Sequence, residues 1–153
     1  MIPLELLAEE IDIEFKFLDD TAKDTRELIA QVSDKEPNNI EKAAATQYLS
    51  QFYNGIENIL KRIIKYKNIK LPKTESWHSD LLQMFDKNNP NAKISLFNDE
   101  IIETLNAYRK IRHVVRQGYS FQLDWQKLSI ALTELPHFLS LFQKIIKDYI
   151  SSI

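Results

Sequence analysis

Apolar side chains in this chain recur at alternating spacings of three and four positions, and that spacing is typical of one face of an α-helix. No segment shows the alternation of period two that would favour a half-buried strand. The first segment opens at Pro3, ends between Ser33 and Asn39, and has one continuous stripe, made of Leu4, Leu7, Ile11, Phe15, Leu18, Ala22, Thr25, Ile29 and Val32. The pattern therefore predicts a long amphipathic helix at the start of the chain.

Two more helices are expected in the middle of the chain. A second stripe runs from Ala45 to Tyr66, between Asn39 and Pro72, and a weaker one covers residues 77–85. Gly55 lies inside the longer stripe, although glycine in a helix interior costs about 1 kcal/mol relative to alanine. We therefore expect Gly55 to mark a close contact between two helices.

The second half of the chain predicts two further long helices. Asn98 is a good N-cap for a helix that stops at Gly118, and Asp124 can cap the last helix. Pro136 falls within the last stripe, so that helix should be kinked or split in two there. Long amphipathic helices with short connections predict an all-α fold, an antiparallel four- to five-helix bundle in one domain over residues 1–153.

Composition excludes several classes of function. The chain has no cysteine, which excludes disulfides, thiolate zinc sites and cysteine nucleophiles. It has only two glycines, so neither a P-loop nor a dinucleotide-binding fingerprint is possible. No apolar run approaches about 18 residues, and the first residues lack a basic signal region. We expect a cytoplasmic protein that requires no membrane, metal or cofactor.

Charge is unevenly distributed, although the net charge is only -2. Acidic residues dominate positions 5–41, whereas positions 61–73 and 109–116 are basic. Such segregation can create a local anion-binding face, and for 61–73 an ordinary solvated helix face is the stronger interpretation.

The third long helix carries the most informative cluster. At about 100° per residue, Arg109, Arg112, His113 and Arg116 fall at one edge of its apolar arc. Like charges at these spacings repel one another by a few tenths of a kcal/mol per pair. A bound anion would offset this repulsion.

RNA cleavage suits these residue types. Guanidinium groups bind phosphate and can stabilise the charge that develops on phosphorus during transfer. An imidazole can take a proton from a ribose 2′-hydroxyl near neutral pH. Because RNA supplies its own nucleophile, the reaction requires neither a metal ion nor a nucleophile from the protein.

Four segments, in order, carry a family resemblance: residues 52–63 (FYNGIENILKRI), 77–82 (WHSDLL), 108–116 (YRKIRHVVR) and 123–125 (LDW). Together they resemble the HepT-like branch of the HEPN superfamily of prokaryotic helical ribonuclease toxins. The resemblance implies a homodimer in which the Arg/His motifs of both copies face a shared cleft. It also implies a minimal nucleotidyltransferase antitoxin that transfers AMP to a tyrosine near the motif.

The resemblance gives roles to residues of the third helix. His113 would be the general base or acid, and one of Arg109, Arg112 and Arg116 would bind the scissile phosphate. The family usually places four to six residues between arginine and histidine and a tyrosine two positions after the histidine. Here three residues separate Arg109 from His113, and Val115 occupies the tyrosine position. Which arginine acts in catalysis therefore stays open.

The remaining tyrosines and histidines are weaker candidates. Tyr119 is the candidate for AMP transfer, with a buried core role equally possible, and Tyr108 is a weaker candidate inside the helix. His78 is expected to pack or cap beside Trp77, and His137 to lie on the surface, because no partners converge on either.

The sequence supports three alternative functions. The first is a metal-independent endoribonuclease toxin with RNA as its substrate. The second is a catalytically silent HEPN bundle that binds a nucleotidyltransferase, which the irregular spacing of arginine and histidine favours. The third is a generic helical interaction module.

Overall fold

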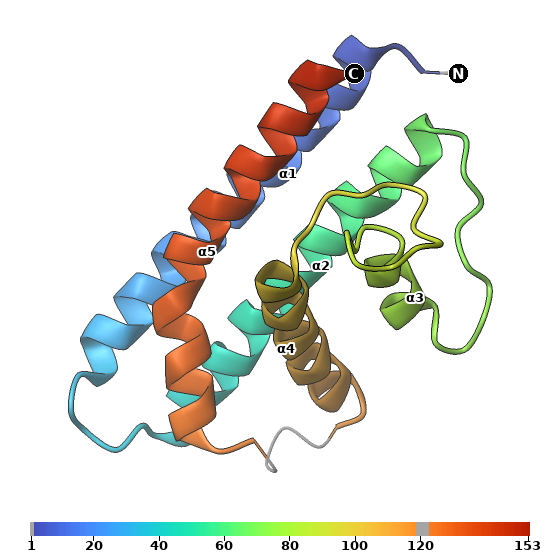
Figure 1. Ribbon diagram of the computed structural model, residues 1–153. Helices are drawn as coiled ribbons and strands as arrows, with labels where there is room; N and C mark the ends of the chain where they lie inside the picture. The colour runs from blue at the N-terminus through green and yellow to red at the C-terminus, as the bar shows by residue number, and fades with distance from the viewer. Residues whose placement is uncertain (1, 119–122) are drawn as a thin grey trace.

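The computed structural model describes residues 2–118 and 123–153, and it contains five α-helices (Figure 1). Their bounds are α1 Leu4–Val32, α2 Asn39–Tyr66, α3 Trp77–Gln83, α4 Asp99–Arg116 and α5 Trp125–Ser152. The all-α prediction is confirmed. None of the helices in the described part of the chain is both long enough and apolar enough to cross a membrane.

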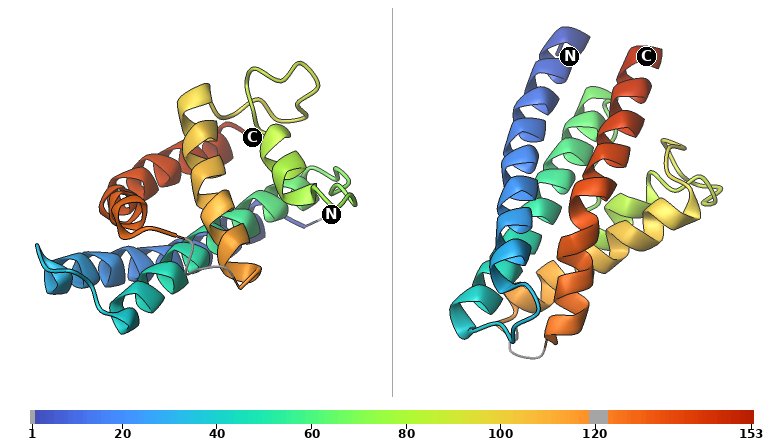
Figure 2. Two further views of the ribbon diagram at one scale, coloured as in Figure 1. Left: turned by 90° about the horizontal axis from the view of Figure 1, so that it is seen from below. Right: turned by 90° about the vertical axis from the view of Figure 1, so that its left-hand side faces the viewer.

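Three long helices form the body of the bundle. α1 packs against α2 and α5, and both neighbours run antiparallel to it, so that the two chain ends lie at the same end (Figure 2). α4 packs on α2 but crosses it obliquely, and α3 lies against α4 (Figures 1 and 2). The predicted bundle is therefore confirmed, with α3 and α4 displaced to one side of the long helices.

Aromatic side chains fix the position of α4. Phe52 of α2 lies edge-on to Tyr108 of α4, with ring centroids 5.0 Å apart, and Phe138 of α5 contacts both rings. The Tyr108 hydroxyl donates a hydrogen bond of 3.0 Å to the backbone oxygen of Ala131. Such offset aromatic contacts add to the free energy of burial and restrict the angle between helices.

The starts of α4 and α5 have the predicted caps. The Asn98 side chain accepts a hydrogen bond from the Ile101 amide at 3.0 Å, and the Asp124 side chain accepts one from the Lys127 amide at 2.8 Å. At the start of α2, Asn38 and Glu41 form a reciprocal capping box. Each cap satisfies a backbone donor that lacks a partner within its helix.

The last helix does not split at its proline. α5 continues through Pro136, and Figure 1 shows it changing direction in this region. The expected kink is the correct alternative, because proline removes one backbone donor but leaves the flanking turns free to continue.

Gly55 marks the predicted close contact. A Cβ atom added to it would lie 2.7 Å from Cδ2 of Leu18, which is buried on α1. The absence of a side chain therefore lets α1 and α2 approach each other.

Gly55→Val should lower the free energy of unfolding by about 2 kcal/mol, because a larger side chain overpacks the contact between α1 and α2. The measurement is chemical denaturation, and Gln51→Val on the exposed face of the same helix is the control, expected to change stability by no more than about 0.5 kcal/mol. Equal effects of the two substitutions would contradict a tight contact at Gly55.

Acidic α1 and the basic end of α2 neutralise each other in part. Arg62 lies 2.8 Å from Glu10 and 3.4 Å from Glu14 of α1. Lys61 lies 5.0 Å from the ring centroid of Trp77. Part of the basic run 61–73 thus contributes to packing between helices.

Candidate active site between α3 and α4

The second half of α4 emerges from the core. Ile101, Leu105 and Tyr108 are buried, whereas Ile111 and Val115 on the same arc are only half-buried. The predicted apolar arc is therefore covered along its first half only, because α2 and α5 do not enclose the last two turns of α4. Those turns carry the predicted arginines and histidine.

A cavity of about 650 Å³ lies between these turns and α3. The four predicted residues of α4 all line it, as do His78 and Trp77 of α3. The remaining lining residues are Glu75, Ser76, Ser79 and Gln117. The structure therefore brings Arg109, Arg112, His113 and Arg116 together around one open volume and adds a second imidazole to them.

The three arginines differ in their partners. Arg112 donates through Nη2 to Oδ1 of Asn54 at 2.9 Å, and its Nη1 lies 4.0 Å from Oε1 of Glu57. Arg109 donates to Asn106 on its own helix at 3.1 Å. Arg116 is exposed and makes no hydrogen bond or ion pair with the residues that the structure describes. Arg112 is thus held to α2, and Arg109 and Arg116 are freer to contact a ligand.

Glu57 connects the two walls of the cavity. Only 1% of this residue is exposed, and its Oε2 lies 2.5 Å from Nδ1 of His78 while its Oε1 faces Arg112. A buried carboxylate requires such partners, because burial without them is costly. One carboxylate of α2 therefore holds a cation of α4 and an imidazole of α3.

Glu57 and Asn54 lie in the segment 52–63 that carries the family resemblance, but neither was predicted to have a role in the site, and His78 was predicted to have a structural role only. His78 does pack on Trp77, with stacked rings 3.6 Å apart, but it also binds Glu57 and lines the cavity. A signal for Glu57 was present. It lies four positions after Tyr53 and three before Leu60, both buried, so it shares their face of α2.

Tyr53 lies behind the cavity wall and is fully buried. Burial raises its pKa far above the ordinary value for tyrosine, and the negative charge of Glu57 adds to that effect, while Arg109 and Arg112 oppose it. The Tyr53 hydroxyl therefore stays protonated near neutral pH.

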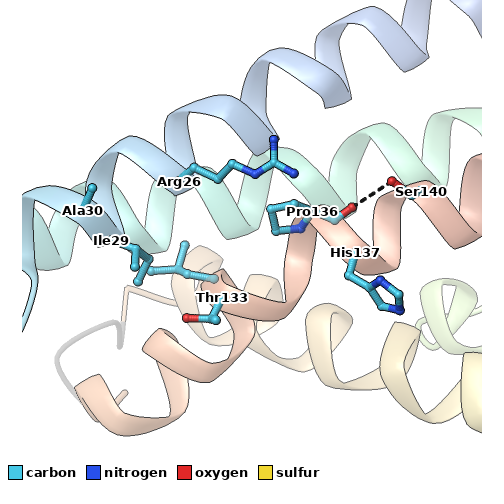
Figure 3. A pocket seen from close by; sticks show the side chains of 8 residues that line it. Arg26, Ile29, Ala30, Thr133, Pro136, His137 and Ser140 are labelled. Atoms are coloured by element: carbon cyan, nitrogen blue, oxygen red, sulfur yellow. Dashed lines mark hydrogen bonds between the residues drawn. The ribbon is translucent and has the colours of Figure 1, made fainter.

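His137 lies on the surface, as expected, beside a different cavity between α1 and α5 (Figure 3). Figure 3 shows its imidazole pointing away from the Arg26 guanidinium, so the two groups do not converge on one ligand. His137 is therefore a suitable control residue for experiments on the other two histidines.

Of the two candidate tyrosines, Tyr119 lies outside the described residues. Tyr108 is buried and its hydroxyl is bonded to Ala131. Burial first, and then the charge of Glu134, raise its pKa above the ordinary value. A modifying enzyme could not reach this hydroxyl without opening the helix packing.

Residues 44–153 match the family described as HepT-like protein. The chain belongs to this family. The match includes most of α2 and all of α3, α4 and α5, so every residue that lines the cavity falls within the HepT-like part. No curated protein and no solved structure matches the chain. The HEPN-type helical fold expected of a HepT-like protein is the fold that the chain has.

Proposed function

We propose that this HepT-like protein is a metal-independent endoribonuclease and the toxin of a HEPN toxin–antitoxin pair. The observation that carries the proposal is the cavity between α3 and α4, in which His113 lies beside Arg109 and Arg116. Its volume of about 650 Å³ lies within the roughly 300–1,000 Å³ typical of ligand sites. The cavity therefore supports binding of a phosphodiester and its flanking ribose.

The proposed reaction is transesterification within RNA. The 2′-hydroxyl attacks the adjacent phosphorus, the bond to the 5′ oxygen breaks, and a 2′,3′-cyclic phosphate forms. His113 serves as a proton-transfer group, and the arginines stabilise the charge on the phosphoryl oxygens. RNA supplies the nucleophile and the leaving group, and residues that line the cavity supply proton transfer and charge stabilisation.

The contacts of the three arginines suggest that they have different roles. Arg112 is held by Asn54 and Glu57, so its main role is to fix the wall of the cavity. Arg109 and Arg116 are proposed to bind phosphate. The arginine adjacent to His113 in the sequence, Arg112, turns toward α2.

Arg116→Gln should weaken RNA binding. It should also make the plot of log affinity against log salt concentration shallower by about 0.7, the slope expected for one phosphate contact on a single strand. Binding is measured with a 2′-O-methylated RNA that cannot be cut. Lys23→Gln, an exposed position on α1, is the control and should leave the slope unchanged. An unchanged slope for Arg116→Gln would exclude this phosphate contact.

We further propose that the protein acts in the cytoplasm as a homodimer whose two copies face a shared cleft, and that a nucleotidyltransferase antitoxin transfers AMP to Tyr119. Family membership supports both proposals, and the half-buried Ile111 and Val115 leave apolar surface on α4 for a second copy. We expect the antitoxin gene in an adjacent reading frame. Incubation of the protein with this nucleotidyltransferase and ATP should add AMP to the peptide that contains Tyr119 and release pyrophosphate. Mass spectrometry of Tyr119→Phe should show no addition.

The experiment for the ribonuclease is incubation of the purified protein with labelled RNA in EDTA. Cleavage of RNA, with no cleavage of the same RNA carrying 2′-O-methyl groups, is the expected result. Intact RNA together with a stable nucleotidyltransferase complex would instead favour the catalytically silent binding partner.

A further inference from the structure

We propose that His78 is a second catalytic residue in the cavity, the acid that protonates the leaving 5′ oxygen. This inference rests on the proposed ribonuclease function and extends it. Cleavage by transesterification moves two protons, one from the 2′-hydroxyl and one to the leaving oxygen, and is best served by two separate groups. The described residues place two imidazoles around one cavity, those of His78 and His113.

Glu57 orients the imidazole of His78. Its Oε2 lies 2.5 Å from Nδ1, which fixes the hydrogen on that nitrogen when the carboxylate is ionised. Nε2 makes no hydrogen bond with any described residue, so this nitrogen is the one available to a ligand. A buried carboxylate that holds one nitrogen of a histidine and leaves the other for chemistry is a recurrent arrangement in catalytic sites.

The surroundings of His78 favour a defined ring position. Trp77 stacks on one face of the imidazole at 3.6 Å, and Lys61 lies over the Trp77 ring. About a quarter of the His78 side chain, 26%, is exposed, whereas its partner Glu57 is buried. The ring is therefore both held in place and accessible from the cavity.

Charges around His78 suit a proton donor. The negative charge comes from Glu57 of α2, which also faces Arg112 of α4. His113, in contrast, shares its turns of α4 with three arginines and has no carboxylate partner among the described residues. The geometry therefore assigns proton donation to His78 and proton acceptance to His113.

The proposed step balances in protons and bonds. His113 accepts the proton of the 2′-hydroxyl as the bond between the 2′ oxygen and phosphorus forms. The bond between phosphorus and the 5′ oxygen breaks, and His78 gives that oxygen the proton from Nε2. Solvent then returns a proton to His78 and removes one from His113. Each copy of the chain thus contains both proton-transfer groups, and a dimeric cleft would hold two complete sites.

The test compares an ordinary RNA substrate with the same substrate carrying sulfur in place of the leaving 5′ oxygen. A thiolate leaves without protonation, so it removes the need for an acid. His78→Ala should cut the ordinary substrate about 10²- to 10⁴-fold more slowly than the native protein, because one general acid or base usually contributes that much to the rate. The same variant should cut the sulfur substrate at close to the native rate. His113→Ala should be slow on both substrates, and His137→Ala should be normal on both.

Each outcome decides between the proposals. If native protein cleaves RNA and His78→Ala keeps more than about a tenth of its rate, His78 is not the acid. If His78→Ala is equally slow on both substrates, His78 supports the structure only. If native protein leaves both substrates intact, the ribonuclease proposal fails, and the role of His78 fails with it.

Discussion

Replacing His113 by alanine is expected to lower the rate of RNA cleavage by about 10²- to 10⁴-fold, the range for loss of a general acid or base. His113 lies on the exposed half of α4 and supports no buried contact, so the fold should not change. The measurement is the initial rate of cleavage of a labelled RNA at saturating protein. RNA affinity should change little, since Arg109 and Arg116 remain.

The matched control for this substitution is His137→Ala. His137 is also an exposed histidine on a long helix, but it lies beside the separate cavity between α1 and α5. The His137→Ala variant should cleave RNA at the native rate. Equal rates for the two variants would remove His113 from the mechanism.

Arg112→Met should lower the free energy of unfolding by about 2 kcal/mol. Breaking a buried ion pair usually costs about 3–5 kcal/mol, and we expect a smaller loss here because Glu57 keeps His78 as a partner. Arg112 is 12% exposed in its side chain and lies 4.0 Å from Glu57, which is a long distance for an ion pair. The variant also loses the hydrogen bond to Asn54. Denaturation by urea measures the change.

Arg116→Met tests whether this loss is specific to Arg112. Both arginines lie on α4, one turn apart, but Arg116 has no partner among the described residues, so its variant should stay within about 0.5 kcal/mol of native stability. Glu57→Gln combined with Arg112→Met should be less destabilised than the sum of the two single variants, because each removes the same pair. Additive losses would show that Arg112 and Glu57 are not coupled.

Local patterns predicted most of the fold. The spacing of apolar residues located the long helices, and Asn98 and Asp124 located two of their starts, because capping depends on neighbours in the sequence. The grouping of His113 with the arginines follows from helix geometry alone. These features depend on contacts within one helix, which a sequence records directly.

Contacts between helices were harder to predict. Glu57 and Asn54 lie on α2, His78 lies on α3, and their convergence on α4 depends on how the helices cross. The exposure of the second half of α4 likewise depends on where α2 and α5 stop covering it. The periodicity of α4 gave Ile111 and Val115 the same apolar face as Tyr108, although only Tyr108 is buried.

Chemical analysis of the RNA ends distinguishes attack by the ribose 2′-hydroxyl from attack by water. Attack by the 2′-hydroxyl leaves a 2′,3′-cyclic phosphate on one fragment and a 5′-hydroxyl on the other. We expect the native protein to produce these ends in EDTA and the His113→Ala variant to lose them. Fragments with a 3′-hydroxyl and a 5′-phosphate would contradict it, because those ends require water, not the ribose, as the attacking group.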